Sequence, residues 1–234
     1  MANNHASIWT VGSGKGGVGK SACVALLAQT LSARELHVIA VDLDLSGSDL
    51  HGLLGVRHPK NNLMTFLTGQ TDTLIDCMVD TEVPNVQLIS CRSSSVSGIA
   101  FSIADKARLV AALESLPADV VLCDLGAGSH LDYVDFMCVA ERQIMVTTGD
   151  PTAIQNTYAF IKACTLRFIE LQLSAEPHLH SKYLEIMKPD SRSTITGIER
   201  VFSELGAPHS ALVGRIKNSL ESYCFYVLPN QVFP

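Results

Sequence analysis

The segment Gly14–Ser21, GKGGVGKS, has the residue types and spacing of a phosphate-binding loop, G-x-x-x-x-G-K-[ST]. Its glycines allow backbone N–H groups to converge on phosphate oxygens, and a helix that begins at the end of the loop adds its dipole. We expect Lys20 to reach the β- and γ-phosphates and the Ser21 hydroxyl to bind Mg²⁺. The loop also carries Lys15, a second lysine that phosphate binding alone does not require.

Aspartates that follow two apolar runs are the candidate partners of a metal-bound triphosphate. Asp124 ends the run VVLCD, and we expect it to hold Mg²⁺ through water as a Walker B aspartate. Asp42 and Asp44 are one residue apart at the end of another run, so in an extended segment their side chains face the same way. One can hold the hydration shell of the cation while the other orients the attacking water. Gly126 and Gly128 give a switch-like turn whose backbone can sense the γ-phosphate.

These residues need a sheet to bring them together. Short apolar runs alternate with amphipathic segments, which is typical of βα units on a parallel sheet. The segment LSAEPHLHSK is predicted to be a surface connection. The chain stops just after a predicted strand, so we expect the C-terminal part of the fold to be truncated. The pattern predicts strands at SIWTV, HVIAVD, VQLIS, ADVVLCDLGAG, QIMVTT and SYCFYVLPNQVF, and helices over about 20–33, 104–115, 150–170 and 190–208.

Composition excludes several classes of protein. With 17 Lys and Arg against 23 Asp and Glu, the net charge of -6 argues against a dominant nucleic-acid surface. Apolar runs stay well below the ~20 residues that span a bilayer, and the N-terminus lacks the features of a signal peptide. The seven cysteines form no C-x-x-C or C-x-C, which argues against a disulfide framework and against a locally spaced zinc or iron–sulfur site. We expect a cytoplasmic protein.

For three further polar groups we favour an ordinary structural role over a functional site. His178 and His180 form H-x-H after a proline, and we favour a surface loop over a metal site. Asp132 and Asp135 lie at i, i+3 on a predicted helix; a helix-terminal charge pair is favoured, and an acidic site that faces a partner is the sharper alternative. The basic turn over residues 57–60 is interpreted as a solvated loop.

Taken as a set, the motifs resemble the deviant-Walker ATPases of the MinD/ParA type. KGGVGKS matches their x-K-G-G-x-G-K-[ST] loop, extra lysine included, and VDLDLSGSDL resembles their second-strand D-x-D segment. DLGAG followed by VTTGDPTAIQNTYAFIK resembles most closely the FlhG (FleN) branch, MinD-like ATPases that regulate flagellar number and placement. The resemblance implies an α/β, three-layer P-loop NTPase fold with a mostly parallel central sheet flanked by helices. Residues 1–234 would form a single P-loop ATPase domain.

The resemblance also implies roles for individual residues. The family forms an ATP-dependent dimer in which the signature lysine, here Lys15, crosses to the partner's nucleotide. Asp44 would position or activate the hydrolytic water, Asn230 would read adenine, and Lys15, Lys20 and Asp44 would be the catalytic residues. The magnesium residues, direct or through water, would be Ser21, Asp42 and Asp124. The nucleotide contacts would come from Gly14, Lys15, Gly16, Gly17, Val18, Gly19, Lys20, Ser21, Ala22 and Asn230.

Three departures from the family bear on its partners. Few residues precede the first predicted strand, where FlhG-type proteins carry a glutamine-containing motif that stimulates the GTPase FlhF. Nothing after Asn230 can serve as the amphipathic membrane helix of MinD-type proteins. The family's PEPT reads GDPT at Gly149–Thr152, which shortens an acidic side chain near the nucleotide. Membrane binding and FlhF stimulation are therefore not supported by this chain.

The main hypothesis is a slow, Mg²⁺-dependent ATPase that forms an ATP-dependent homodimer. It would regulate the position or number of a cellular structure, of the flagellar, division or partitioning type, through a protein partner. The alternative is a nucleotide-gated scaffold that binds ATP or ADP and a partner with little hydrolysis. A phosphotransferase or a metal-cluster carrier on the same scaffold is a third candidate, against which the absence of C-x-x-C and of a tyrosine-rich tail argues.

Overall fold

The computed structural model shows how the strands are arranged, and it describes residues 5–44, 50–57, 61–91, 101–188, 194–206 and 210–231. The strands within these ranges form one sheet in the order β3-β4-β2-β5-β1-β6-β7. Neighbouring strands are parallel, except that β3 runs antiparallel to β4. Their bounds are β1 Ser7–Ser13, β2 Val38–Leu43, β3 Met78–Asp80, β4 Val86–Ile89, β5 Val120–Ala127, β6 Arg142–Thr147 and β7 Phe225–Pro229.

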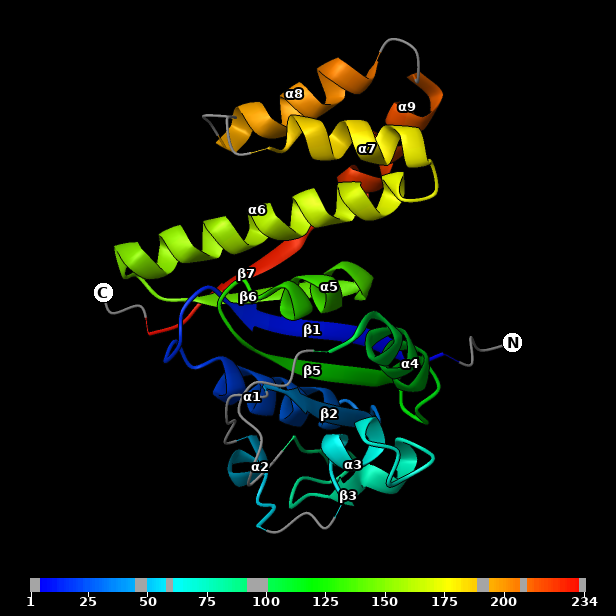
Figure 1. Ribbon diagram of the computed structural model, residues 1–234. Helices are drawn as coiled ribbons and strands as arrows, with labels where there is room; N and C mark the ends of the chain where they lie inside the picture. Colours follow the sequence, from blue (N-terminus) through cyan, green and yellow to red (C-terminus); the bar gives the residue numbers. More distant parts are fainter. Residues whose placement is uncertain are drawn as a thin grey trace.

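Helices flank the sheet on both sides (Figure 1). Alternate residues of β2 point to opposite faces, so that Ile39 and Val41 join one apolar cluster while Val38 and Ala40 join the other. Helices α1 and α2 contribute to the second cluster, and α3, α4 and α5 to the first. The helix bounds are α1 Lys20–Ser32, α2 Leu50–Leu53, α3 Leu63–Leu67, the 3₁₀ turn η1 Ile75–Cys77, α4 Ile103–Glu114, α5 Leu131–Val139, α6 Pro151–Leu173, α7 Pro177–Ile186, α8 Thr194–Gly206 and α9 Ser210–Ser222.

The predicted fold class is confirmed: the chain has the three-layer P-loop NTPase fold, with a mostly parallel sheet between helices. The expected strands and the helices that begin near residues 20, 104 and 150 are present, while residues 58–60 of the predicted basic turn lie outside the described residues. The short edge strand β3 was not predicted. No helix within the described ranges is long and apolar enough to cross a membrane.

Helix α6 begins with strong local signals. Asp150 is its N-cap, and its side chain accepts a hydrogen bond from the Thr152 N–H at 2.8 Å, while Pro151 occupies the first helical position. The helix then runs across the carboxyl end of β1 and packs closely on the phosphate loop. A Cβ built on Gly14 would lie only 2.3 Å from the backbone carbon of Asn156, so glycine is required where the loop passes under α6.

The segment predicted to be a surface connection, residues 173–182, is a connection only over residues 174–176, and the prediction was wrong for residues 177–182, which belong to a helix. Helix α7 begins with Pro177 and buries Leu179, Tyr183 and Ile186, which lie four and seven residues apart on one face. The H-x-H sequence is part of helix α7 rather than of a loop. His180 Nε2 lies 3.3 Å from Glu170 Oε1. Within the described residues, no group of three or more His, Cys, Asp and Glu side chains could hold a metal ion.

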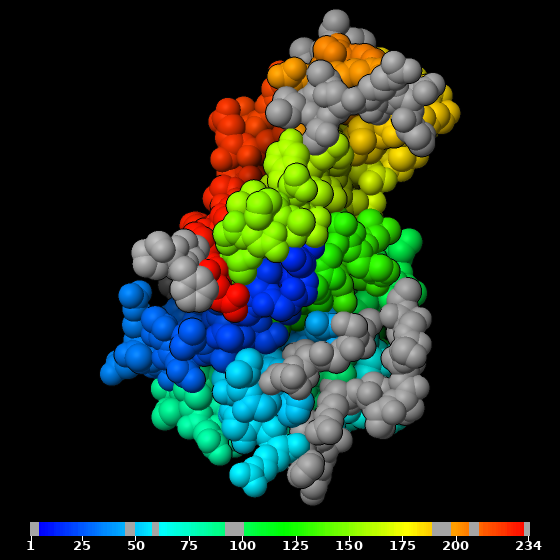
Figure 2. Space-filling model, turned by 90° about the vertical axis from the view of Figure 1, so that its left-hand side faces the viewer, coloured from blue at the N-terminus to red at the C-terminus, as the bar shows by residue number. Residues whose placement is uncertain are grey.

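Residues 166–173 of α6, together with α7, α8 and α9, form what we call the helical layer. They share an apolar cluster of their own that includes Ile169, Leu205 and Ile216. Figure 1 shows α7 and α8 on the side of α6 that faces away from the sheet, and Figure 2 shows the layer as an upper lobe of the molecule. The layer therefore packs mainly on itself and joins the sheet through α6 and β7.

Candidate functional site

The phosphate loop connects β1 to α1 at the centre of the sheet. Gly17 and Gly19 have φ values of 79° and 86°, in the left-handed region that glycine adopts without strain. No side chain of the described residues caps α1 at Gly19, so the first N–H groups of the helix are available to an anion. An open cavity of about 510 Å³ lies beside the loop, lined by Lys15, Gly16, Gly17, Val18, Thr148, Gly149, Asp150 and Gln231.

Lys20, in the first turn of α1, forms a buried ion pair with Asp124 of β5. The Lys20 side chain is 7% exposed and that of Asp124 is fully buried, and Nζ contacts Oδ1. Burial raises the pKa of the Asp124 carboxyl, while the Lys20 ammonium and the Ser21 hydroxyl lower it. The charge of Lys20 is therefore balanced by the carboxylate expected to hold Mg²⁺.

The second oxygen of Asp124 fits the predicted magnesium site. Its Oδ2 atom is buried without a hydrogen-bond partner among the described residues, an arrangement that proteins avoid unless a water or an ion completes it. Asp42 is directly opposite Asp124 in the register of β2 and β5, and it is 1% exposed. Carboxylate and hydroxyl oxygens are the ligands that Mg²⁺ prefers, directly or through water. The residues present are thus suited to a hydrated magnesium ion.

Asp44 lies just beyond the end of β2 and is partly exposed. Its backbone N–H donates to Asp42 Oδ1 at 3.0 Å, which fixes the turn that follows the strand. The fold thus brings Asp42, Asp44, Asp124 and Lys20 to one edge of the sheet, where the parallel strands β2 and β5 end. A water held between Asp44 and a phosphate bound by the loop would face a carboxylate that can accept its proton.

Lys15 has a different environment from Lys20. It lies on the rim of the cavity with its side chain 43% exposed, and its Nζ atom is 2.7 Å from Asp150 Oδ2 and 3.0 Å from Thr152 Oγ1. The ammonium of Lys15, with the N–H and hydroxyl of Thr152, lowers the pKa of Asp150 to about 2. The acidic residue of the GDPT segment therefore holds the second lysine at the start of α6, at the mouth of the site.

Asn230 follows β7 and lies against the phosphate loop. Its Nδ2 donates to the Val18 carbonyl at 2.8 Å, and its backbone N–H donates to the Thr147 carbonyl at 2.7 Å. A Cβ on Gly19 would lie 2.3 Å from the same Nδ2 atom. Figure 2 shows the red end of β7 beside the blue N-terminal part of the chain. Asn230 thus precedes Gln231 of the cavity lining, and its amide nitrogen holds the loop; its role as an adenine reader stays a prediction.

Of the two glycines of the predicted switch-like turn, Gly126 lies within β5 and Gly128 just beyond its end, and an aromatic ring that sequence reasoning missed covers Gly126. A Cβ on Gly126 would lie 2.0 Å from Tyr133 Oη, so the phenol of α5 sits directly over that glycine. Gly128 has a φ of 91°, and its N–H donates to the Ser13 carbonyl at 2.9 Å, which ties the turn to β1. No sequence motif marks Tyr133, because its position depends on how α5 packs on β5.

Asp132 and Asp135 do not face a partner. Asp132 is 5% exposed and its Oδ1 lies 2.7 Å from Lys106 Nζ, while Asp135 contacts both Lys106 and Arg167. The two carboxylates form inward ion pairs with neighbouring helices, so the idea of an acidic docking site on α5 was wrong.

Comparison with known proteins places this geometry in a family. The sequence model of ParA, described as NUBPL iron-transfer P-loop NTPase, matches residues 4–165. The chain is 30% identical over 165 residues to the antiactivator FleN of Pseudomonas aeruginosa, covering 69% of this chain and 58% of FleN. It is 33% identical over 169 residues to the flagellum site-determining protein YlxH of Helicobacter pylori, covering 70% of this chain and 55% of YlxH.

Solved structures agree with the sequence relatives. The cell division ATPase MinD of Pyrococcus furiosus is 28% identical with a TM-score of 0.55, covering 65% of this chain and 64% of that one. A septum site-determining MinD from Pyrococcus horikoshii, solved with Mg-ADP, is 26% identical with a TM-score of 0.55, covering 66% and 63%. The chain spans about half to three fifths of the length of its first curated relatives. The matched motifs and the fold together show that this chain belongs to the ParA family of P-loop NTPases, with FlhG-type and MinD-type proteins among its relatives.

Proposed function

We propose that this protein is a Mg²⁺-dependent ATPase that works as an ATP-driven dimerisation switch. In this proposal the dimer regulates the position or number of a cellular structure by binding a partner protein in one nucleotide state and releasing it in the other. The names of the relatives support the regulatory part, since FleN is an antiactivator, YlxH determines a flagellum site and MinD determines a septum site.

The observation that carries the proposal is that one lysine of the loop is buried and the other is exposed. Lys20 is buried against Asp124, where it would meet the phosphates of its own chain, whereas Lys15 is held at the exposed rim by Asp150. A cation at the rim adds little to phosphates that Lys20 already contacts. Once released from Asp150, however, Lys15 would be able to contact a nucleotide bound by a second copy. A loop that only bound phosphate would need Lys20 alone.

The chemistry follows from the residues at the edge of the sheet. The loop N–H groups and Lys20 would bind and orient the triphosphate, and Asp44 would hold the attacking water and accept its proton. Asp124, Asp42 and Ser21 would hold Mg²⁺, which when bound neutralises charge on the transferred phosphoryl group. Asn230 would border the base. Lys15 of a second copy would add a positive charge to the γ-phosphate region, so hydrolysis would depend on dimerisation.

The test is phosphate release measured as a function of protein concentration with Mg·ATP. The proposal predicts a rate per chain that rises with concentration, falls to background when Mg²⁺ is chelated, and is lost in Lys20→Ala. A saturable nucleotide affinity with a release rate that stays at background at every concentration would instead favour the scaffold hypothesis. A rate per chain that does not depend on concentration would contradict the dimer requirement.

A further inference from the structure

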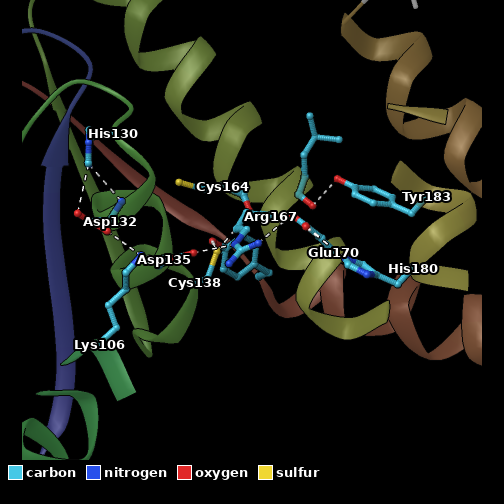
Figure 3. Close-up of polar contacts among 12 residues, drawn as sticks. Lys106, His130, Asp132, Asp135, Cys138, Cys164, Arg167, Glu170, His180 and Tyr183 are labelled. Carbon is cyan, nitrogen blue, oxygen red and sulfur yellow. Dashed lines mark hydrogen bonds and ion pairs between the residues drawn. The ribbon is translucent and has the colours of Figure 1, made fainter. Parts of the chain in front are cut away.

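A continuous chain of charged side chains connects helices α4, α5, α6 and α7 (Figure 3). Asp135 of α5 is shared: its Oδ2 lies 2.5 Å from Lys106 Nζ on α4, and its Oδ1 lies 2.7 Å from Arg167 Nε on α6. Arg167 Nη1 in turn contacts Glu170 Oε2 at 2.9 Å, and Glu170 contacts His180 of α7. One carboxylate therefore links α5 to both neighbouring helices.

The input end of this chain is the switch-like turn. Helix α5 starts four residues after Ala127, the last residue of β5, and His130 caps it by accepting from the Asp132 N–H. Tyr133, in the first turns of α5, lies directly over Gly126. Because the ring leaves no room for a Cβ on that glycine, a displacement of Gly126 by a bound phosphate would press on α5 through Tyr133.

The output end is the helical layer, which begins where the family match ends at residue 165. Arg167 stands at the start of the layer, next to Leu166, whose carbonyl accepts a hydrogen bond from Tyr183 Oη of α7 at 2.9 Å. The layer has its own apolar cluster, separate from the two clusters that flank the sheet. A change in the position of Asp135 would therefore reach α7 through Arg167.

The layer is also connected to the nucleotide cavity at both of its ends. Helix α6 starts at Asp150, which holds Lys15, and β7 ends beside Asn230, which holds the Val18 carbonyl. Between them, Tyr223 stacks on Phe168 with ring centroids 4.4 Å apart, so the end of α9 rests on α6 close to Arg167. The layer is thus connected to the phosphate loop through the first part of α6 and through β7, and to α5 through the Asp135–Arg167 ion pair.

From these contacts we infer that the helical layer changes state with the bound nucleotide, and that the Asp135–Arg167 ion pair is the joint that transmits the change from α5. The inference rests on the proposed function only in that the input is a bound nucleotide. Coupling through this ion pair is tested by removing it while the binding site is left intact. Asp135 can be neutralised without leaving either of its two cationic partners unpaired, because Lys106 retains Asp132 and Arg167 retains Glu170.

The experiment is backbone hydrogen exchange, read by peptide, with and without Mg²⁺ and a non-hydrolysable ATP analogue. In the wild-type chain, peptides of the phosphate loop should be protected, and peptides of α7 and α9 should change their exchange rate by about fivefold or more, the lower end of measured coupling between sites. In Asp135→Asn, loop protection should persist while the change in α7 and α9 falls below about twofold. Arg167→Gln is a second variant with the same expectation.

Arg200→Gln is the matched control. Arg200 pairs with Glu204 inside α8, so the same substitution in the same layer breaks no link between helices, and the response should stay as in the wild type. The inference is overturned if the loop is protected while α7 and α9 do not respond in the wild type, or if their response survives in Asp135→Asn and Arg167→Gln. An unprotected loop in the wild type would contradict the proposed function itself, and this inference with it.

Discussion

Lys15 Nζ lies 2.7 Å from Asp150 Oδ2, so the lysine that its own phosphate site does not need is held by the aspartate of the GDPT segment. The ammonium also lies 3.0 Å from Thr152 Oγ1, and all three groups are at the exposed mouth of the cavity. The contact is an exposed one, and such pairs contribute little to stability. We therefore interpret it as a resting position from which Lys15 can be released to a second nucleotide.

The pKa of Asp150 reports this contact. The carboxyl should titrate at about 2 in the wild-type chain, because ionisation is favoured by Lys15 and Thr152. In Lys15→Met it should move up toward the ordinary value of 3.8, since the largest cause is removed. Because the folded value is depressed, the stabilisation it gives is present above the unfolded pKa and is lost as pH falls toward 2. Carboxyl ¹³C NMR between pH 2 and 6 measures the midpoint.

Asp105 is the internal control for that titration, since its pKa is lowered by Ser102 and not by Lys15, and it should be the same in both chains. If Asp150 still titrates near 2 in Lys15→Met, the ion pair is not the cause of its depressed pKa.

Replacing Lys20 should make stability depend on pH. In Lys20→Met, Asp124 remains buried without its cation, which should lower the free energy of unfolding by about 3–5 kcal/mol at pH 8. Burial raises the pKa of Asp124, and a raised folded pKa means that stability is recovered as pH falls and the carboxyl is protonated. Urea unfolding at pH 5 to 8 measures the trend. The double variant Lys20→Met/Asp124→Asn should be nearly independent of pH over this range, and a pH-dependence equal to that of the single variant would show that another group titrates.

Asp44→Ala should separate binding from hydrolysis. The loop, Lys20 and Asp124 are unchanged, so nucleotide affinity should be close to wild type, while phosphate release should fall by about 10²–10⁴-fold, the contribution of a general base. Asp72→Ala, an exposed carboxylate far from the site along the chain, is the control and should be fully active. Release by Asp44→Ala at the wild-type rate would exclude Asp44 as the group that holds the water.

Gly126→Ala should lower the free energy of unfolding because the new methyl group would overlap the Tyr133 side chain. The new methyl group would lie 2.0 Å from Tyr133 Oη, and relief of that overlap should cost about 1–3 kcal/mol in thermal or urea unfolding. Tyr133→Ser should remove most of the cost in a double-mutant cycle. Gly149→Ala, whose Cβ meets nothing within 4 Å, should change stability by less than about 0.5 kcal/mol. Equal costs with and without the tyrosine ring would show that the strain lies elsewhere.

The sequence predicted the part of the site that depends on local motifs. The spacing of Gly14, Lys20 and Ser21 marks the loop by itself, and the rule that parallel strands end at one edge brings Asp42 and Asp124 together. The sequence singled out Asp150 because GDPT departs from the family's PEPT. Its contact with Lys15 could not be predicted, because it depends on the path of α6 over the loop.

Features that depend on packing between helices could not be predicted. The spacing of Leu179, Tyr183 and Ile186 is helical, yet the histidines and charges between them gave α7 the composition of a surface connection. Asp132 and Asp135 occupy one face of α5, but only Lys106 and Arg167 on neighbouring helices show that this face points inward. The position of Tyr133 over Gly126 likewise follows from the packing of α5 and not from a motif.

The central claim is that Lys15 acts on the nucleotide of a second copy. It is tested most directly by the mass in solution, from light scattering during size exclusion, with Mg²⁺ and a non-hydrolysable ATP analogue at saturation. The wild-type chain should have the mass of one chain without nucleotide and of two chains with it, whereas Lys15→Ala should bind the analogue through Lys20 and remain a single chain. A wild-type chain that stays monomeric when saturated, or a Lys15→Ala chain that dimerises and hydrolyses ATP like the wild type, would contradict the account.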